Sequence, residues 1–566
     1  MQSGVATRTG AAPRIRSFGV WIGWVFGLVF AALTLDPAYV VGKGPYWDAP
    51  VGDIAKGEIG WYYYARDSWR FPIFDIETYH YPEGGNVMLS DSLPLLALPM
   101  KVVYKLTSAP EKDPPIYTGL WVAFCLVLQA VAASRLLRVL GVDDPLAHIA
   151  GIALFCYLPI VMLRFGQAGL MAQGLILISL AAYVRAKHDG LSRKQWIALC
   201  ALPPLTLLVH PYLTLMCGVL IAATILDQWR ERRIGVHFVL ACFGSMAAFA
   251  VVLMLAGGFF GATKGGFDDY GLYSLNLLSP WIPFPNTLTG TLLHTEFPVI
   301  PGTNQWEGGA YLGAGMMLLC VLALPALKHW RANLKRHAVL FVLLVLVLIF
   351  AVSQRVGFGT HELRLPIPDF LLHALSQFRG SGRFVWLAVY ALLAAAIVAI
   401  ATRYGAARAR TIFVIAAVLA IADVWPMQRG IRAASASAQP SSINRAEWTR
   451  LIEAHKRIFQ YPSFECGGLF GWGVPGSKFR GVEIDWIAAE RNIPTNSAYL
   501  ARFTKDCDRE AVDAAANIGE HGVLHLYRST EETGAFLAVH GADLNRCGYL
   551  DDVVVCSADM DLGTLH

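Results

Sequence analysis

The chain alternates apolar stretches with short polar loops, and Lys and Arg gather in every second loop. Eleven apolar stretches approach the ~20 residues that a helix needs to cross a bilayer. They lie at 18–35, 116–134, 146–164, 168–184, 195–209, 211–228, 237–260, 310–327, 338–353, 383–402 and 411–427. This pattern predicts a polytopic α-helical membrane protein with about eleven transmembrane helices.

Composition agrees with this interpretation. Of the 566 residues, 55% are hydrophobic and only 15% are charged. A chain of this length and apolarity does not fit a single soluble core. Nothing in the composition or the motifs indicates a nucleic-acid partner or a soluble cofactor. The sequence leaves open whether a divalent cation is needed.

The basic loops predict the orientation in the membrane. They lie at Arg8 to Arg16, Arg135 to Arg138, Arg185 to Lys194, Arg230 to Arg233, Lys328 to Arg336 and Arg403 to Arg410. Lys and Arg favour cytoplasmic loops, so these segments are expected inside and the N-terminus is cytoplasmic. The intervening connections are then extracytoplasmic, namely 36–115, 263–309, 354–382 and the tail after 428. We expect a transmembrane domain over 1–428 and a separate domain over 429–566.

The tail at 429–566 has a different character. Strand-like runs alternate there with helical and Gly-rich stretches, at 457–461, 523–527 and 553–556. Asn444 can cap a helix that begins there, with Glu447 three residues later. The tail is therefore expected to form a small α/β domain. Because it contains no nucleotide loop, metal-ligand spacing or nucleophile elbow, acceptor recognition or a lid role suits it better than chemistry.

Four of the ten cysteines fall in this tail, at Cys466, Cys507, Cys547 and Cys556. An oxidising compartment permits disulfides, so at least one is expected if the tail is extracytoplasmic. The alternative is four free thiols in a cytosolic tail.

Ionisable side chains are almost absent from the predicted spans away from their ends. A transporter or proton pump requires such groups near the midplane. They gather instead at the outer edge, as Asp36, Asp48, Asp53, Glu58, His80, Asp91, Glu296, Glu307, Arg364, Arg379 and Arg383. A site at this boundary suits a substrate that has a lipid tail and a polar head.

The first outer loop, 36–115, is amphipathic in two segments, Trp61 to Phe74 and Asp91 to Tyr104. The first mixes aromatic residues with Arg66 and Arg70, as helices in the headgroup region do. Two such in-plane helices would form the walls of a groove open to lipid. The alternative is a belt of interfacial aromatic residues with no site between them.

Several short motifs carry a resemblance to a known family. They are Gly52-Asp53 followed by GWYYYARDSWRFP, the segment from Ser90 to Lys101, EGGAYLG at Glu307 to Gly313 and FRGSGRF at Phe378 to Phe384. With the predicted spans and tail, they resemble the GT-C glycosyltransferases, the superfamily of protein mannosyltransferases and lipid A aminoarabinose transferases. More narrowly, they are similar to a bacterial GT-C-like family catalogued mostly as a domain of unknown function.

This resemblance implies inverting transfer of a sugar from a polyprenyl-phosphate donor, on the periplasmic side of a bacterial inner membrane. The acceptor would be a glycan, lipid or protein of the cell envelope. The family pattern has Gln-His shortly after the Gly-Asp, whereas this chain has Lys56-Gly57. Glu58 or His80 is therefore a candidate for the second polar group of the loop.

Two acidic residues have candidate roles. Inverting transfer requires a base that takes the proton of the incoming hydroxyl, and Asp53 is the candidate. The alternative is that Gly52-Asp53 only makes a turn, which Asp does readily. Asp91 can orient the acceptor, hold a cation, or cap the following helix.

The leaving lipid phosphate requires fixed positive partners, and an Arg side chain provides a bidentate fork. Arg379 and Arg383 are the expected pair, with Arg364 in reserve. The alternative is that these side chains are interfacial anchors. Glu307 and His210 are weaker candidates for the site, and His210 suits a hydrogen bond within its turn.

Two other classes of function remain. A lipid or glycan flippase would share the spans and the outer basic residues, but would place polar groups through the interior of the bundle. A non-catalytic scaffold that presents the tail domain would tolerate the loss of Asp53.

Overall fold

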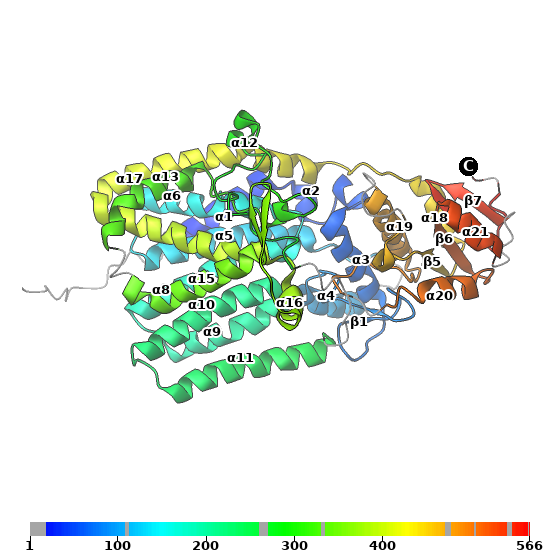
Figure 1. Cartoon of the computed structure of the whole chain (residues 1–566), viewed down its shortest axis with the longest axis horizontal. Coiled ribbons are helices and arrows are strands. Elements are labelled where there is room, and N and C mark those ends of the chain that lie inside the picture. Colours follow the sequence, from blue (N-terminus) through cyan, green and yellow to red (C-terminus); the bar gives the residue numbers. More distant parts are fainter. Residues whose placement is uncertain are drawn as a thin grey trace, which may run out of the picture.

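The computed structural model describes residues 18–107, 112–259, 270–329, 334–469, 477–502, 505–539, 546–563 and 565. The basic segment predicted at Arg8 to Arg16 lies outside the described residues. The molecule is elongated and mostly helical, with a helical bundle at one end and a small sheet-containing domain at the other (Figure 1).

Helices lie at the positions of all the predicted apolar stretches. They are α1 (Phe18–Thr34), α5 (Thr118–Val139), α6 (Pro145–Cys156) with α7 (Pro159–Met162), α8 (Gly174–His188), α9 (Arg193–Leu207), α10 (Pro211–Arg230), α11 (Val236–Gly257), α13 (Ala314–Ala323) with η4 (Leu324–His329), α15 (Ala338–Val352) and α17 (Val385–Ala436). Gly405, with φ 73°, interrupts α17 and divides it into two helices.

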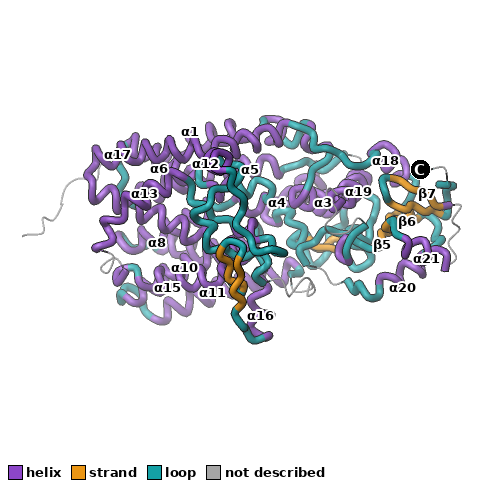
Figure 2. Tube along the Cα trace, turned by 45° about the horizontal axis from the view of Figure 1, so that its top comes forward, coloured by secondary structure: helices purple, strands orange, loops and turns teal. Residues whose placement is uncertain are grey.

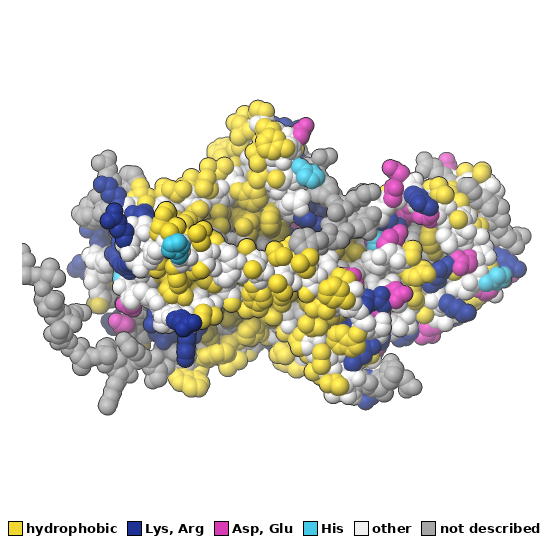
Figure 3. Space-filling model, turned by 90° about the horizontal axis from the view of Figure 1, so that it is seen from below, with side chains coloured by type: hydrophobic (Ala, Val, Ile, Leu, Met, Phe, Trp, Pro, Cys, Tyr) yellow, Lys and Arg dark blue, Asp and Glu magenta, His cyan; other side chains and the backbone are white. Residues whose placement is uncertain are grey.

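Within the described residues, five helical segments are long and apolar enough to cross a membrane. They are Thr118–Val139, Ala168–His188, Pro211–Arg230, Val236–Gly257 and Ser381–Ala436. Figure 3 shows hydrophobic side chains over the middle of one face. Lys and Arg gather at the end away from the small domain, and both signs of charge cover that domain. The bundle has the features of a membrane protein, whereas the count of eleven crossings stays a prediction.

Small residues let the helices of the bundle approach closely. A Cβ added to Gly27 of α1 would lie 2.8 Å from Cα of Val127 in α5, and one added to Gly23 would lie 3.0 Å from Cβ of Ser134. Glycine at these positions therefore permits the tight packing that replaces the hydrophobic driving force within a membrane.

The first outer loop contains α2 (Pro37–Val40), η1 (Pro45–Asp48), α3 (Gly52–Arg66), β1 (Asp75–Ile76), β2 (Gly85–Asn86) and α4 (Pro94–Thr107). Helices α3 and α4 lie between the bundle and the small domain (Figure 1). The aromatic residues Trp61, Tyr63 and Tyr64 of α3 are buried inside the protein. These rings pack against protein, and α3 ends at Arg66, so only the first part of the segment from Trp61 to Phe74 is helical. That this segment lies in the membrane plane stays a prediction. Helix α4 does expose apolar side chains, including Val103 and Leu106.

The later outer loops contain α12 (Leu288–Leu293), η3 (Gln305–Gly308), β3 (Arg355–Phe358), β4 (His361–Arg364), α16 (Asp369–Leu375), η5 (Ser376–Phe378) and η6 (Ser381–Phe384). Strands β3 and β4 pair antiparallel, and this hairpin projects with α16 from the side of the bundle (Figure 2). The chain then returns through η5 and η6 into α17.

The small domain contains α18 (Arg445–Glu453), β5 (Arg457–Tyr461), η7 (Phe464–Cys466), α19 (Ser477–Arg491), α20 (Glu510–Asn517), β6 (Val523–Arg528), α21 (Glu531–Val539), β7 (Cys547–Leu550) and β8 (Val553–Ser557). Its four-stranded sheet has the order β5-β6-β8-β7. Strands β5 and β6 are parallel, and the other pairs are antiparallel. The three predicted strands are present, and Asn444 caps α18 as expected.

Two disulfides join the cysteines of this domain, Cys466 to Cys507 and Cys547 to Cys556. The prediction of at least one disulfide is confirmed. The second bond joins residues that face each other on β7 and β8. The first closes a segment that carries part of the site described below.

Candidate functional site

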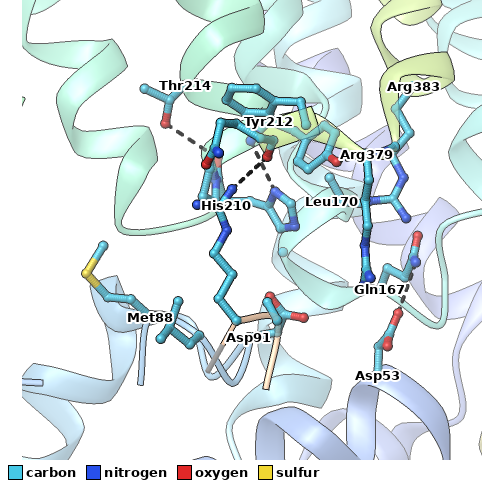
Figure 4. A pocket seen from close by; sticks show the side chains of 18 of the residues that line it. Asp53, Met88, Asp91, Gln167, Leu170, His210, Tyr212, Thr214, Arg379 and Arg383 are labelled. Carbon is cyan, nitrogen blue, oxygen red and sulfur yellow. Dashed lines mark hydrogen bonds between the residues drawn. The ribbon is translucent and has the colours of Figure 1, made fainter. Parts of the chain in front are cut away.

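A cavity of ≈ 560 Å³ lies where the first outer loop, the outer ends of the bundle helices and the small domain meet. Six of the nine site residues expected from the sequence line it, namely Asp53, Asp91, His210, Glu307, Arg379 and Arg383. Figure 4 shows Arg379 and Arg383 extending toward Gln167 and Asp53. The cavity therefore combines carboxylates and guanidinium groups from segments distant in the sequence.

Asp53 projects from the first turn of α3. Gly52 begins this helix with φ 61°, a backbone conformation that favours glycine. Both carboxylate oxygens of Asp53 accept hydrogen bonds: Oδ1 from the hydroxyl of Tyr499 at 2.9 Å, and Oδ2 from Nε2 of Gln167 at 3.0 Å. The Gly-Asp pair therefore makes the turn and also fixes a carboxylate in the cavity.

Asp91 forms an ion pair with Lys56 of α3, with 2.7 Å between Oδ2 and Nζ. Burial disfavours the charged carboxylate of Asp91, but Lys56 and then His210 outweigh it and hold the pKa of Asp91 below its usual value. The backbone around Asp91 passes so close to α3 that a Cβ added to Gly57 would lie 3.2 Å from the Asp91 carbonyl oxygen. Asp91 thus acts in an ion pair, and α4 begins only at Pro94.

Glu307 lies between two arginines. Its Oε2 accepts a hydrogen bond from Nη1 of Arg164 at 3.1 Å, and it also forms an ion pair with Arg383. Burial raises the energy of the Glu307 carboxylate, but Arg383 and then Arg164 outweigh this and lower its pKa to about 2. Glu307 therefore keeps two buried guanidinium groups in place beside the cavity.

The turn between η5 and η6 positions the basic residues of the cavity wall. The Tyr212 hydroxyl accepts a hydrogen bond from the Gly380 backbone at 2.8 Å. The guanidinium of Arg383 lies 5.2 Å from the centre of the Tyr212 ring, and that of Arg379 lies 5.7 Å from the Tyr273 ring. Aromatic faces attract cations, so these contacts hold both arginines at the cavity.

His210 precedes α10 and caps it, because its Nδ1 accepts a hydrogen bond from the Tyr212 backbone at 3.3 Å. Burial is the main cause that lowers the pKa of His210, to about 4. The imidazole is therefore neutral at pH 7, and the hydrogen bond within the turn that the sequence suggested is present.

Apolar residues line another part of the cavity. They come from the turn before α8, from α9 and α10, and from α11 and the turn that follows it, and include Leu170, Leu207, Leu215, Met254 and Phe259. A cavity with a charged part and an apolar part suits an amphiphilic ligand.

Three of the expected site residues lie outside this cavity. Glu58 is buried in α3, where burial raises its pKa to about 7. His80 is buried against Glu465 of the small domain, with 3.3 Å between Nε2 and Oε1. Arg364 is 69% exposed in the β3–β4 hairpin and pairs with Glu362. These positions give no support to catalytic roles for Glu58 and His80 or to phosphate binding by Arg364.

Several residues that line the cavity were not among those expected from the sequence. They include Lys56, Gln167, Tyr499 and Arg502. Lys56 was visible as a departure from the family pattern, and it lines the cavity, whereas Glu58 and His80 do not. Gln167 lies in a polar break between two apolar stretches. Tyr499 is 446 positions from its partner Asp53, and no local pattern links the two residues.

The donor set of the cavity does not fit a dedicated metal site. The oxygens of Asp53 accept from an amide and a hydroxyl, and Asp91 is paired with an ammonium group. Among the described residues, no group of three or more His, Cys, Asp or Glu side chains could hold a metal ion.

Two family models match the chain. The domain of unknown function DUF6311 matches residues 24–425, and the DUF6311 C-terminal domain matches residues 447–558. The chain belongs to the DUF6311 family. This agrees with the expected resemblance to a family of unknown function. No curated protein matches the chain in sequence.

Solved structures with some similarity include the archaeal oligosaccharyltransferase AglB from Archaeoglobus fulgidus, in complex with an inhibitory peptide and a dolichol-phosphate. It is 12% identical with a TM-score of 0.44, over 90% of this chain and 69% of that chain. The Archaeoglobus fulgidus oligosaccharyltransferase tethered to an acceptor peptide with the NVT sequon is 13% identical with a TM-score of 0.42, over 93% and 71% of the two chains.

Proposed function

We propose that this protein is a GT-C-type membrane glycosyltransferase. It would transfer a sugar from a polyprenyl-phosphate donor to a glycan, lipid or protein of the cell envelope. One observation carries the proposal. Asp53, held through both carboxylate oxygens, lines the same cavity as the guanidinium groups of Arg379 and Arg383. A fixed base and fixed cations are the two parts that displacement of a phosphate-linked sugar requires.

The charges of the cavity favour an anionic headgroup. Its ionisable lining comprises the cations Lys56, Arg379, Arg383 and Arg502 and the acids Asp53, Asp91 and Glu307. Lys56 pairs with Asp91, and Arg383 pairs with Glu307. The buried Arg164 shares the Glu307 carboxylate and adds one more positive charge beside the cavity. A phosphate ester complements this excess of positive charge, and the apolar lining accommodates the first part of its lipid chain.

The reaction would proceed as a single displacement. The acceptor hydroxyl oxygen attacks the anomeric carbon of the sugar, while Asp53 takes the hydroxyl proton. The bond between that carbon and the phosphate oxygen breaks, and its electrons leave with the polyprenyl phosphate. Each oxygen of Asp53 accepts one hydrogen bond and has a second lone pair available for the proton. Attack opposite the leaving group inverts the anomeric configuration.

Arg379 and Arg383 would stabilise the charge that develops on the phosphate. Because Glu307 holds Arg383 in place before the donor binds, little reorganisation is needed at the moment of transfer. We place this chemistry on the periplasmic side of a bacterial inner membrane, with the small domain also periplasmic.

A gene deletion defines the product and Asp53→Asn tests the base. Mass spectrometry of surface glycans, lipids and envelope proteins should identify one sugar-bearing species that the deletion strain lacks. Asn keeps the shape of Asp53 but cannot take a proton, so the variant should form this species ~10²–10⁴-fold more slowly. Asp48 is an exposed acid in the same loop, and the Asp48→Asn variant, expressed in the deletion strain, should restore the species fully.

Arg379→Ala should weaken use of the donor, and Arg379→Lys should restore it only in part, because an ammonium group cannot reproduce the fork. Arg364→Ala, outside the cavity, is the matched control and should behave as the wild type. If Asp53→Asn forms the product normally while Arg379→Ala blocks lipid export, the protein is a flippase. A deletion strain that lacks no sugar-bearing species would also overturn the proposal.

A further inference from the structure

The small domain supplies a side chain to the cavity. Tyr499 lies in an extended segment, 495–502, that leaves the sheet edge and runs along the first outer loop. Thr495 bridges both Ile458 of β5 and Tyr79 of the loop. Farther along, the Ala501 backbone donates to the Leu89 carbonyl at 2.8 Å. The segment therefore spans the distance between the sheet and the cavity.

Tyr499 contacts Asp53 and also Lys56, the ion-pair partner of Asp91. Its hydroxyl donates to Oδ1 of Asp53 at 2.9 Å, and the Lys56 ammonium, the partner of Asp91, lies 5.0 Å from the centre of its ring. Burial raises the pKa of the Tyr499 phenol further above neutrality, so the hydroxyl keeps its proton and acts as a donor to Asp53. One side chain thus links Asp53 to Lys56.

The ring of Tyr499 is held from behind by the small domain. Phe464 of η7 stacks on it with 4.4 Å between ring centres, and the Phe464 backbone donates to Oγ of Ser497 at 3.0 Å. The Tyr499 backbone in turn donates to the Tyr79 hydroxyl at 3.0 Å. These contacts fix the direction in which the Tyr499 hydroxyl points.

We propose, resting on the function above, that Tyr499 is a positioning residue for Asp53 and that the small domain thereby completes the active site. Gln167 holds one oxygen of Asp53 from the bundle, and Tyr499 holds the other from the small domain. Only with both bonds is the carboxylate oriented so that one of its free lone pairs faces the acceptor hydroxyl. The role of the tail therefore extends to aligning the base.

The test separates the hydroxyl of Tyr499 from its ring. The probe is the farnesyl-phosphate ester of the sugar that the deletion strain lacks, supplied to the purified full-length protein together with cell envelopes of the deletion strain, which contain the unmodified acceptor. Tyr499→Phe keeps the stacking on Phe464 and loses only the bond to Asp53. Its kcat should fall about 10-fold, the typical effect of one hydrogen bond to a charged group, with KM changed less than about 2-fold. Its melting temperature should equal that of the wild type.

A purely structural role predicts the opposite pattern. In that case Tyr499→Phe is neutral and Tyr499→Leu, which removes the ring, lowers both melting temperature and activity. Tyr549→Phe, which changes an exposed side chain on β7 of the same domain, is the matched control and should change neither constant.

A double-mutant cycle with Asp53 tests whether Tyr499 acts through that residue. In an Asp53→Glu background, the carboxylate is displaced by one methylene and the bond to Tyr499 is no longer aligned. Adding Tyr499→Phe should then cost less than about 2-fold, because coupled residues are not additive. An unchanged kcat in Tyr499→Phe, with Asp53→Asn inactive, overturns the positioning role and leaves the proposed function intact. A fully active Asp53→Asn overturns both.

Discussion

Arg164 and Glu307 form an ion pair beside the cavity, with 3.1 Å between Nη1 and Oε2 and only 1% of the Arg164 side chain exposed. Arg383 pairs with the same oxygen of this carboxylate. One carboxylate therefore holds two guanidinium groups, and the three side chains together keep one net positive charge. Removing the carboxylate would leave positive charges buried without a partner, which is costlier than losing a surface salt bridge.

Glu307→Gln is accordingly expected to destabilise the protein by about 3 kcal/mol, the lower end of the cost of breaking a buried pair. The measurement is the melting temperature in detergent at pH 7. Glu296→Gln changes an exposed acid nearby and should leave the melting temperature unaltered. Equal melting of Glu307→Gln and the wild type would show that the arginines do not depend on Glu307.

The helical bundle could be predicted from the sequence because its signals are local. Apolar runs, basic loops and the strand pattern at 457–461 each lie within one segment, and the helices and strands occur at those positions. The cluster of acids and arginines at the outer edge could also be predicted, since the topology brings the outer loops together.

The bonds that orient Asp53 could not be predicted. Gln167 and Tyr499 reach it across 114 and 446 positions, and tertiary packing alone creates such contacts. The burial of the α3 aromatic residues could not be predicted for a related reason. Trp61 and its neighbouring tyrosines suit a membrane interface and a protein interface equally well. Contacts with distant segments decide between them, such as Trp61 with Tyr117 and Tyr62 with Trp486 of α19.

The two disulfides should differ in their effect on the site. Replacing Cys466 and Cys507 with Ser opens a loop with a separation of 41 residues, whereas the pair Cys547 and Cys556 closes only 9. In the chain-entropy model, loops of these lengths contribute roughly 4 and 2.5 kcal/mol to the free energy of unfolding.

The Cys466/Cys507 variant should also lose product formation in cells, because Phe464, which stacks on Tyr499, lies two residues from Cys466. The Cys547/Cys556 variant is the control and should retain the product. Equal retention in both would separate the disulfide from the alignment of Tyr499.

Glu465 should make stability depend on pH. Burial raises the pKa of Glu465 to about 8 from an ordinary value near 4.5. The folded state then keeps a proton that the unfolded state loses. Its contribution is complete below about pH 4.5 and is lost as pH rises through 8, in total on the order of 5 kcal/mol.

Glu465→Gln mimics the protonated side chain and should remove this loss. Between pH 5 and 8.5 its melting temperature should fall less than that of the wild type, which is checked by thermal unfolding across that range. Glu531→Gln, exposed on α21, should follow the wild-type curve. A Glu465→Gln curve parallel to the wild type would show that Glu465 is already ionised in the folded protein.

The orientation in the membrane follows from where the charges lie. The basic segments at 135–138, 185–194, 230–233 and 403–410 adjoin the ends of α5, α8, α10 and the first half of α17. Lys and Arg gather at the end of the bundle away from the small domain (Figure 3). With these residues in the cytoplasm, the cavity and the small domain face the periplasm.

Alkaline phosphatase fused after residue 440 should therefore be active, and fusions near 190 and 332 should be inactive. The reverse pattern would put Asp53 and the arginines in the cytoplasm, where a donor on the outer leaflet cannot reach them, and would refute the proposed site.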